Sequence, residues 1–173
     1  FGEGTEEEPP PNKYMEFGSV VDKAIETGEG EDPTLKMISK LATKYQIMQA
    51  EIHAEYKGLK LMGKLDTFNP ETLAFRDYKT SKNPWTQGKL DSDKQFTWYA
   101  MLIALRYNQL PASMHVDWIE TEEENGELRL TGRSPVELET KRSLIDLAEM
   151  SKSAVEVATE ISEHYKKFMD SIR

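Results

Sequence analysis

Two short segments of the sequence carry side chains whose types and spacing could do chemistry on a phosphate ester. Asp66 ends the sequence GKLD, and Asp77 and Lys79 stand two positions apart in the sequence DYKTS. Side chains two positions apart on a strand point to the same face, so Asp77 and Lys79 share a face and Tyr78 points away. Where two such strands run side by side, their ends can bring Asp66 next to this pair.

These groups would suit a hard divalent cation. Two carboxylates and a backbone carbonyl supply the oxygen ligands that Mg²⁺ or Mn²⁺ prefers, and an ammonium would stand beside the metal-bound water. Such a site can polarise a phosphoryl oxygen and deliver hydroxide near neutral pH. Each piece also has an ordinary interpretation. An Asp-x-Lys triplet is commonly a solvated strand edge, and Asp66 could be a turn residue ahead of Asn69-Pro70.

Gln95 and Tyr99 lie one turn apart on the face of a predicted helix that follows these segments. Both residues have a structural alternative. The spacing Ser92-x-x-Gln95 fits a capping box, which would explain the glutamine without any ligand. An aromatic residue at the Tyr99 position is often part of the hydrophobic core.

The spacing of apolar and turn residues predicts the elements that must position these groups. We expect helices over residues 14–27 and 33–48, two strands between 49 and 69 around a turn at 56–58, a third strand over 73–79, a loop over 80–91 and a helix over 92–108. Further strands are expected at 114–121 and 127–131, followed by one long or two shorter helices from about 140, interrupted at Ser151. Helix, three-strand meander, helix and strand in this order predict an α/β fold.

Length and composition predict one domain. With 173 residues and 38% hydrophobic residues, the chain can bury one sizeable core, over residues 14–173, behind a flexible acidic, Pro-rich tail at 1–13. The sequence contains no run of about 18 apolar residues and no signal-like start, so we expect a soluble, cytoplasmic protein without a membrane partner. The absence of cysteine excludes disulfides, a cysteine nucleophile and an iron–sulfur cluster.

The net charge of −9 at first argues against nucleic acid, but its distribution matters more. Residues 57–94 hold eight basic groups against five acids, whereas residues 1–32 and 95–173 are acidic. Within the basic segment, Lys82, Lys89 and Lys94 are the candidates for contacting DNA phosphates. They could equally be ordinary solvated surface lysines.

In this order, GKLD, DYKTS and the QxxxY pattern of QFTWY resemble the second, third and helical motifs of the RecB-like exonuclease branch of the PD-(D/E)XK nuclease superfamily. The resemblance covers about residues 17–118 and implies a restriction-endonuclease-like core, with a mixed central sheet that contains the antiparallel meander and is flanked by helices. It also implies that Asp66, Asp77 and the Tyr78 carbonyl bind the metal and that Lys79 positions or activates the attacking water.

The resemblance assigns further residues and shows two departures. Gln95 and Tyr99 would shape the site and hold DNA, and Glu51 matches an acidic position that supports the metal directly or through water, although it could be a solvated strand carboxylate. The first helix of this branch commonly carries Gly-x-x-x-His, whereas GSVVD here offers Asp22 as a ligand or as a surface acid. The cysteines that hold an iron–sulfur cluster in several relatives are missing.

The resemblance implies a Mg²⁺- or Mn²⁺-dependent deoxyribonuclease. We expect an exonuclease acting on single-stranded DNA or duplex ends, in DNA repair, recombination, or phage or CRISPR-type DNA processing, joined to a larger parent chain or working with a helicase, recombinase or polymerase. One alternative is a DNA-binding or assembly module with the same fold and little or no turnover. Another is an acidic helical interaction protein whose motif matches are accidental.

Overall fold

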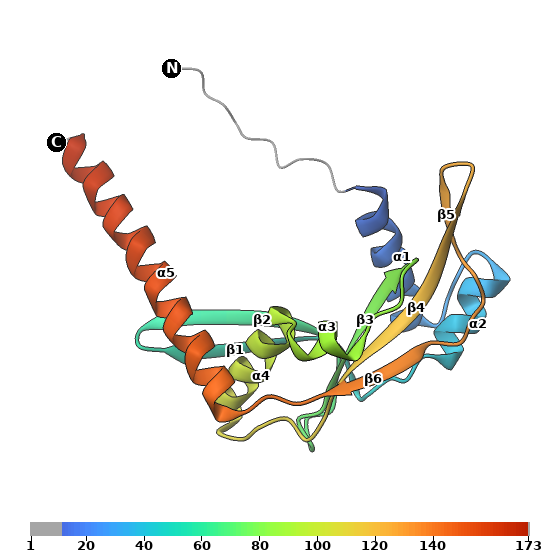
Figure 1. The fold of residues 1–173 in the computed structure, drawn as a ribbon, viewed down its shortest axis with the longest axis horizontal. Coiled ribbons are helices and arrows are strands. Elements are labelled where there is room, and N and C mark those ends of the chain that lie inside the picture. The colour runs from blue at the N-terminus through green and yellow to red at the C-terminus, as the bar shows by residue number, and fades with distance from the viewer. Residues whose placement is uncertain (1–11, 173) are drawn as a thin grey trace. The chain divides into compact units, whose positions relative to one another are not determined.

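The structure is a computed structural model that describes residues 12–172 (Figure 1). The predicted flexible tail falls on residues 1–11, outside the described residues, and on the start of the first helix. The chain divides into two compact units. Unit 1 contains the chain up to residue 42 with residues 79–84 and 118–135, and unit 2 contains residues 43–78 and 85–117 with the chain from residue 136. Between residues 12 and 172, none of the helices has the length and apolar character needed to cross a membrane.

Unit 2 is built on an antiparallel hairpin. β1 (Ile47–Tyr56) pairs with β2 (Leu59–Phe68) in a register that sets Ala50 opposite Leu65. The turn residues Lys57 and Gly58 both have positive φ, 49° and 78°, which is the geometry of the two-residue turns that match strand twist. The predicted pair of strands around this turn is therefore confirmed.

β3 (Phe75–Ser81) continues the meander. It pairs antiparallel with β2 through Thr67↔Arg76 and Phe68↔Phe75. The connecting turn is held by Asn69, whose Oδ1 accepts hydrogen bonds from the backbone N–H groups of Glu71 and Thr72 at 3.0 and 3.3 Å. The strand order is β1-β2-β3-β4-β5, where β4 is Met114–Glu124 and β5 is Glu127–Leu130, and β6 (Val136–Thr140) pairs with β4. β3 and β4 each run from one unit into the other.

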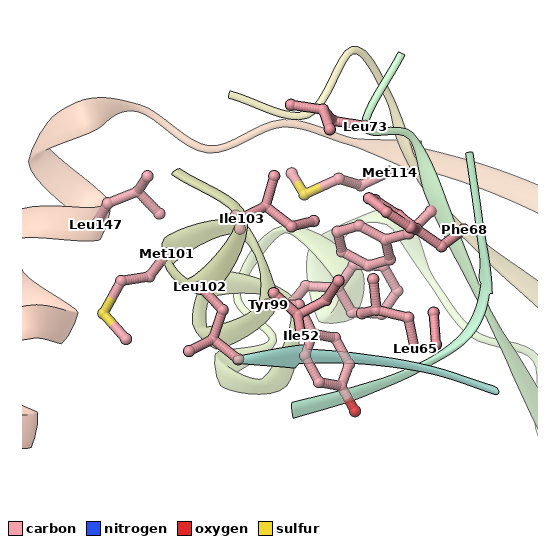
Figure 2. Close-up of a cluster of buried hydrophobic side chains, with 14 of the residues drawn as sticks. Ile52, Leu65, Phe68, Leu73, Tyr99, Met101, Leu102, Ile103, Met114 and Leu147 are labelled. Carbon is pink, nitrogen blue, oxygen red and sulfur yellow. The ribbon is translucent and has the colours of Figure 1, made fainter. Parts of the chain in front are cut away.

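α4 (Lys94–Tyr107) covers the hairpin and supplies much of the core of unit 2. Tyr99 and Leu102 pack toward the strands (Figure 2). They can do so because Gly63 of β2 has no side chain. A Cβ there would lie 2.7 Å from Leu102 Cδ1 and 3.0 Å from Tyr99 Cε1, closer than packed atoms tolerate. The helix therefore lies directly on bare backbone of β2.

The start of α4 corrects one sequence-based alternative. The predicted capping box of Ser92 and Gln95 is wrong, because Asp93 caps the helix and accepts a hydrogen bond from the backbone N–H of Phe96 at 3.0 Å. Ser92 instead ends the short helix α3 (Gln87–Asp91), where the loop was expected, and its hydroxyl donates to the carbonyl of Gly88 at 2.8 Å.

The C-terminal part of unit 2 contains β6 (Val136–Thr140), which was not predicted, and the 28-residue helix α5 (Leu144–Ser171). The predicted interruption at Ser151 is wrong, because its hydroxyl donates to the carbonyl of Leu147 at 2.7 Å within an unbroken helix. The buried Arg142 lies two residues before α5 and connects this part of the chain to α3 and α4. Its guanidinium donates to the carbonyls of Leu90 and Asp93 and to the hydroxyl of Thr97, all within 2.9 Å.

Unit 1 contains α1 (Lys13–Thr27), α2 (Pro33–Leu41), β5 (Glu127–Leu130) and parts of β3 and β4 (Met114–Glu124). α1 packs on α2 and ends at Gly28 with φ 74°, as predicted. α2 begins after the cap Asp32 but ends at Leu41 rather than Met48. Asn125 and Gly126 both have positive φ and close the predicted hairpin of β4 and β5.

Candidate active site

Asp66 and Asp77 occupy neighbouring positions on adjacent strands of unit 2. The last ladder pair of β2 and β3 is Thr67↔Arg76, and Asp66 and Asp77 are the next residues along their strands. Asp66 Oδ2 accepts a hydrogen bond from the backbone N–H of Tyr78 at 2.7 Å, so the carboxylate of β2 reaches across to β3 beside Asp77. The Asp77 side chain lies in the interior, and the residue is 5% exposed. Two acidic groups therefore meet beside the Tyr78 peptide.

α4 places a tyrosine hydroxyl close to these two acids. Gln95 Nε2 donates to Tyr99 Oη at 2.9 Å, and the Tyr99 ring packs edge-on against Phe75 with centroids 5.7 Å apart. The pKa of Tyr99 is raised, chiefly by burial and then by the negative charges of Asp77 and Asp66. The hydroxyl therefore stays protonated and keeps its proton available as a hydrogen-bond donor.

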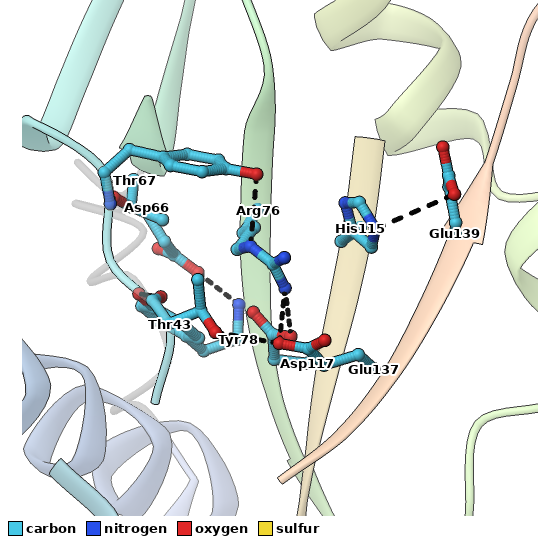
Figure 3. A network of polar contacts seen from close by, with 10 residues as sticks. Thr43, Asp66, Thr67, Arg76, Tyr78, His115, Asp117, Glu137 and Glu139 are labelled. Atoms are coloured by element: carbon cyan, nitrogen blue, oxygen red, sulfur yellow. Dashed lines mark hydrogen bonds and ion pairs between the residues drawn. The ribbon is translucent and has the colours of Figure 1, made fainter. Parts of the chain in front are cut away.

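The residues on either side of Asp77, Arg76 and Tyr78, make hydrogen bonds from the other face of β3. Tyr78 Oη donates to the carbonyl of Thr43 at 2.6 Å. The Arg76 guanidinium donates to Asp117 Oδ1 at 2.8 Å, to Glu137 Oε1 at 2.9 Å and to Tyr45 Oη at 3.2 Å (Figure 3). Arg76 and Tyr78 thus form one side of the strand and Asp77 the other, in agreement with the predicted alternation.

Asp117 is fully buried and carries an incomplete set of hydrogen bonds. Its Oδ2 has no hydrogen-bond partner among the described residues. Burial raises the pKa of Asp117 to about 7, although the Arg76 charge acts in the opposite direction. Neither Arg76 nor Asp117 was singled out from the sequence. The signal that could have found them is a charged residue within an otherwise apolar strand, in LAFRDYK and in MHVDWI, because such residues are seldom buried unless paired.

Lys79 and Asp22 belong to unit 1. Lys79 is half-buried on β3, two positions after Asp77. α1 approaches the end of this strand closely, since a Cβ at Gly18 would lie 3.3 Å from Thr80 Oγ1. Asp22 is half-buried one turn beyond Gly18 on the same helix. The glycine of GSVVD thus serves the close approach of helix and strand, while the ligand role of Asp22 stays a prediction.

Glu51 lies on the exposed face of β1. Its side chain is 59% exposed, lies 3.2 Å from His53 Nε2 and faces Lys64 across the hairpin. This arrangement favours the solvated carboxylate over the supporting ligand. Within residues 12–172, no group of three or more histidine, aspartate or glutamate side chains could hold a metal ion.

The remaining donors fit a hard cation better than a soft one. The acids Asp66 and Asp77 and the carbonyl of Tyr78 supply oxygen only, which is the ligand chemistry of Mg²⁺ and Mn²⁺. Asp77 is buried and Asp66 beside it is half-buried, so a cation bound between them would relieve their mutual repulsion. The donor set is therefore compatible with a divalent ion.

The three candidate DNA-binding lysines, Lys82, Lys89 and Lys94, are all exposed. Lys89 lies over the ring of Trp85, with its Nζ 4.2 Å from a ring centroid. The exposed positions suit contact with phosphate and also suit ordinary surface lysines.

No protein-family model and no curated protein sequence matches the chain. Among solved structures, the chain is similar to a candidate exonuclease from Eubacterium rectale, with a TM-score of 0.50 and 14% sequence identity over 88% of this chain and 67% of that one. The two chains share a fold. It is a mixed α/β arrangement with a central mixed sheet flanked by helices.

At 14% identity this similarity concerns the fold alone. What the fold and the contacts bring together within unit 2 is a set of four predicted site residues: Asp66, Asp77, Gln95 and Tyr99. Glu51 lies on the exposed face of β1, and the metal and DNA roles of all these residues stay predictions.

Proposed function

We propose that this chain is a metal-dependent deoxyribonuclease of the RecB-like PD-(D/E)XK type, acting as an exonuclease on DNA ends. The observation that supports it best is the meeting of Asp66 and Asp77 beside the Tyr78 peptide, under the hydroxyl of Tyr99. Three separate sequence segments predicted to share one site contribute to this cluster. A chance match of isolated motifs would not require them to converge.

In the proposed site, Asp66, Asp77 and the Tyr78 carbonyl would hold Mg²⁺ or Mn²⁺. When bound, such a cation polarises a phosphoryl oxygen and makes water a better nucleophile at neutral pH. The Lys79 ammonium would orient the attacking water, whose oxygen bonds to phosphorus as the ester bond opposite it breaks. The attacking water loses a proton to solvent, and the departing oxygen leaves as a hydroxyl group after taking a proton from solvent. Tyr99, held by Gln95, offers its proton to a phosphate oxygen and so stabilises the charge that develops there.

The lysines of the basic segment extend the site toward the DNA strand. Lys82, Lys89 and Lys94 neutralise phosphates and release counterions, which supplies affinity without sequence preference. A second candidate function is a DNA-binding or assembly module that retains the fold without turnover. The specific observation in its favour is that residues 12–172 contain no group of three or more histidine, aspartate or glutamate side chains that could hold a metal ion.

The deciding experiment uses end-labelled linear DNA and closed circular DNA, each single- and double-stranded, with Mg²⁺, Mn²⁺ or a chelator. An exonuclease would shorten linear DNA in the presence of metal, leave circular DNA intact and cleave nothing when the chelator is present. Asp66→Asn, Asp77→Asn and Lys79→Ala should each abolish cleavage with a thermal midpoint near that of the parent. The Asn variants keep the shape of the side chain, and at Asp66 they keep an oxygen for the Tyr78 N–H.

Glu55→Gln, at an exposed position of β1, is the matched control and should cut like the parent. Metal-independent retention of DNA without any cleavage would favour the binding module. Absence of both cleavage and DNA retention would contradict each of the two functions.

A further inference from the structure

Arg76 is a charged residue held almost entirely inside unit 2. It is 7% exposed, and its guanidinium binds Asp117 of β4, Glu137 of β6 and Tyr45, with the Tyr45 ring face 5.4 Å away. Its partner Asp117 is 0% exposed. Figure 3 shows the Arg76 guanidinium with its carboxylate partners Asp117 and Glu137.

Stability alone is a poor explanation for this ion pair. Removing two charges from water costs several kcal/mol per ion, and replacing a buried pair by well-packed apolar side chains is often neutral or stabilising. The cost here is not fully offset, because Asp117 Oδ2 has no hydrogen-bond partner in the part of the chain that the structure describes. A pair of this kind is better explained by what it positions.

The position it controls is the peptide on either side of Asp77. Arg76 precedes Asp77 and is tied to β4 and β6, while Tyr78 follows it and is tied by its hydroxyl to Thr43 and by its N–H to Asp66. Directional bonds at both neighbours leave the backbone little freedom to rotate at Asp77. The carboxylate of Asp77 and the carbonyl of Tyr78, two of the three proposed metal ligands in this unit, are set by the same stretch of backbone.

We propose that the buried Arg76–Asp117 pair is a positioning device that holds Asp77 and the Tyr78 carbonyl in the geometry that binds the divalent cation. This role rests on the proposed function, since it needs a metal site at Asp66 and Asp77. Arg76 and Asp117 touch neither metal nor substrate. They act through the backbone of β3, as groups behind a metal ligand commonly do, and loss of such groups lowers metal affinity by about 10- to 100-fold.

The test separates stability from metal binding. In the double variant Arg76→Met/Asp117→Val, apolar side chains replace the pair in the full chain. Thermal unfolding without metal and Mn²⁺ titration by calorimetry are then measured for the same preparation. We expect an apo thermal midpoint equal to or above that of the parent, together with Mn²⁺ affinity about tenfold weaker or more.

A matched control removes an ion pair that has no contact with the proposed metal ligands. Arg129→Met/Glu122→Val deletes an exposed pair of the β4–β5 hairpin, with Nε and Oε1 2.6 Å apart, and should leave the Mn²⁺ affinity unchanged. Cleavage at saturating Mn²⁺ should be near the parent rate in the Arg76 and Asp117 variant, because the ligands themselves are intact.

The outcomes distinguish the two levels of the proposal. Unchanged Mn²⁺ affinity in Arg76→Met/Asp117→Val overturns the positioning role while leaving the metal site standing. A parent chain that binds no Mn²⁺, or an Asp77→Asn variant that binds it like the parent, overturns the proposed function instead. Should the double variant unfold, the single variant Asp117→Asn decides, because it keeps the shape of the side chain and removes the negative charge that faces the Arg76 guanidinium. Weaker Mn²⁺ binding then supports the positioning role, and parental binding contradicts it.

Discussion

The carboxylates of Asp66, Asp77 and Asp117 in unit 2 differ in what compensates their charge. Asp66 accepts a backbone N–H, and Asp117 faces a guanidinium at 2.8 Å. Asp77 lies between these two environments on β3, beside a tyrosine that stays protonated. Burial of a carboxylate is tolerated only where hydrogen bonds or opposite charge offset the loss of water. Asp66 and Asp117 are therefore each held by a particular neighbour, which makes single substitutions informative.

Asp22 tests whether the first helix contributes to the metal site. If it does, three carboxylates repel one another until a cation binds, and Mg²⁺ or Mn²⁺ should raise the thermal midpoint by mass action on the folded state. Asp22→Asn should reduce both this gain and the rate of cleavage. Asp22→His should keep activity and shift preference toward Mn²⁺, because imidazole is a softer ligand.

The measurement is thermal unfolding over a metal titration, with cleavage assayed in parallel. An Asp22→Asn variant that is stabilised by metal and cuts like the parent would assign Asp22 to the surface. The site in that case depends on Asp66 and Asp77.

Asp117 should make the stability of the protein depend on pH. Its pKa of about 7 in the folded state lies above the ordinary value of 3.8, so the unfolded chain releases this proton first. The contribution of the protonated form is fully present below pH 3.8 and is lost as pH rises toward 7, at up to about 1.4 kcal/mol per pKa unit. Unfolding in denaturant at several pH values between 4 and 7 measures the slope. Asp117→Asn should flatten it, and an unchanged slope would contradict the assignment.

At the scale of elements, β2 supports both the packing of α4 and the chemistry of Asp66. Gly63 allows Tyr99 and Leu102 to rest on the strand, and Asp66 stands three residues later where β2 meets β3. Gly63 and Asp66, the first and last residues of GKLD, therefore have separate roles. Gly63 leaves space for the helix, and Asp66 supplies the carboxylate.

Gly63→Ala should destabilise the fold by about 1–3 kcal/mol, because the added methyl group would meet Leu102 and Tyr99 within 3.0 Å. Displacement of Tyr99 should also lower the rate of cleavage. Gly88→Ala is the control, since nothing lies within 4 Å of the added carbon. Equal denaturation midpoints for the two variants would contradict the close packing of α4 on β2.

For the molecule as a whole, the distribution of charge decides how an acidic protein could bind DNA. The net charge of −9 would repel a polyanion, whereas the segment 57–94 is basic and contains Asp66, Asp77 and Lys79. Local positive charge releases counterions from DNA, and its effect falls with salt. The proposed function requires that binding depend on this segment rather than on the total.

We expect the affinity for single-stranded DNA to fall steeply with salt. In the triple variant Lys82→Glu, Lys89→Glu, Lys94→Glu, the slope of log affinity against log salt should decrease by about one unit per lost phosphate contact. Changing the exposed Lys152, Lys166 and Lys167 of α5 to Glu alters the net charge equally and should leave the slope nearly unchanged. Equal slopes in the two triple variants would assign Lys82, Lys89 and Lys94 to ordinary surface.

Much of the fold follows from local sequence. Lys57-Gly58 and Asn125-Gly126 adopt the positive φ that two-residue turns need, and Gly28 ends α1 as a glycine cap does. Such features depend on a few consecutive residues, so the strands and helices around them could be predicted. Competition between neighbours is harder to judge, and Asp93 rather than Ser92 caps α4. β6 was not predicted at all; it pairs with β4, which is distant in sequence.

For the candidate site, the sequence by itself determined which residues have suitable chemistry and that Asp77 and Tyr78 point to opposite sides of a strand. Only the tertiary structure decided that Arg76 is buried against Asp117 and Glu137, which lie 41 and 61 residues away in the chain. It also decided that Gln95 binds Tyr99 rather than the helix start, and that Glu51 lies on an exposed face. The physical reason is that burial and pairing of a charge depend on strands that come together only when the sheet forms. The local spacing of residues does not indicate which strands pair.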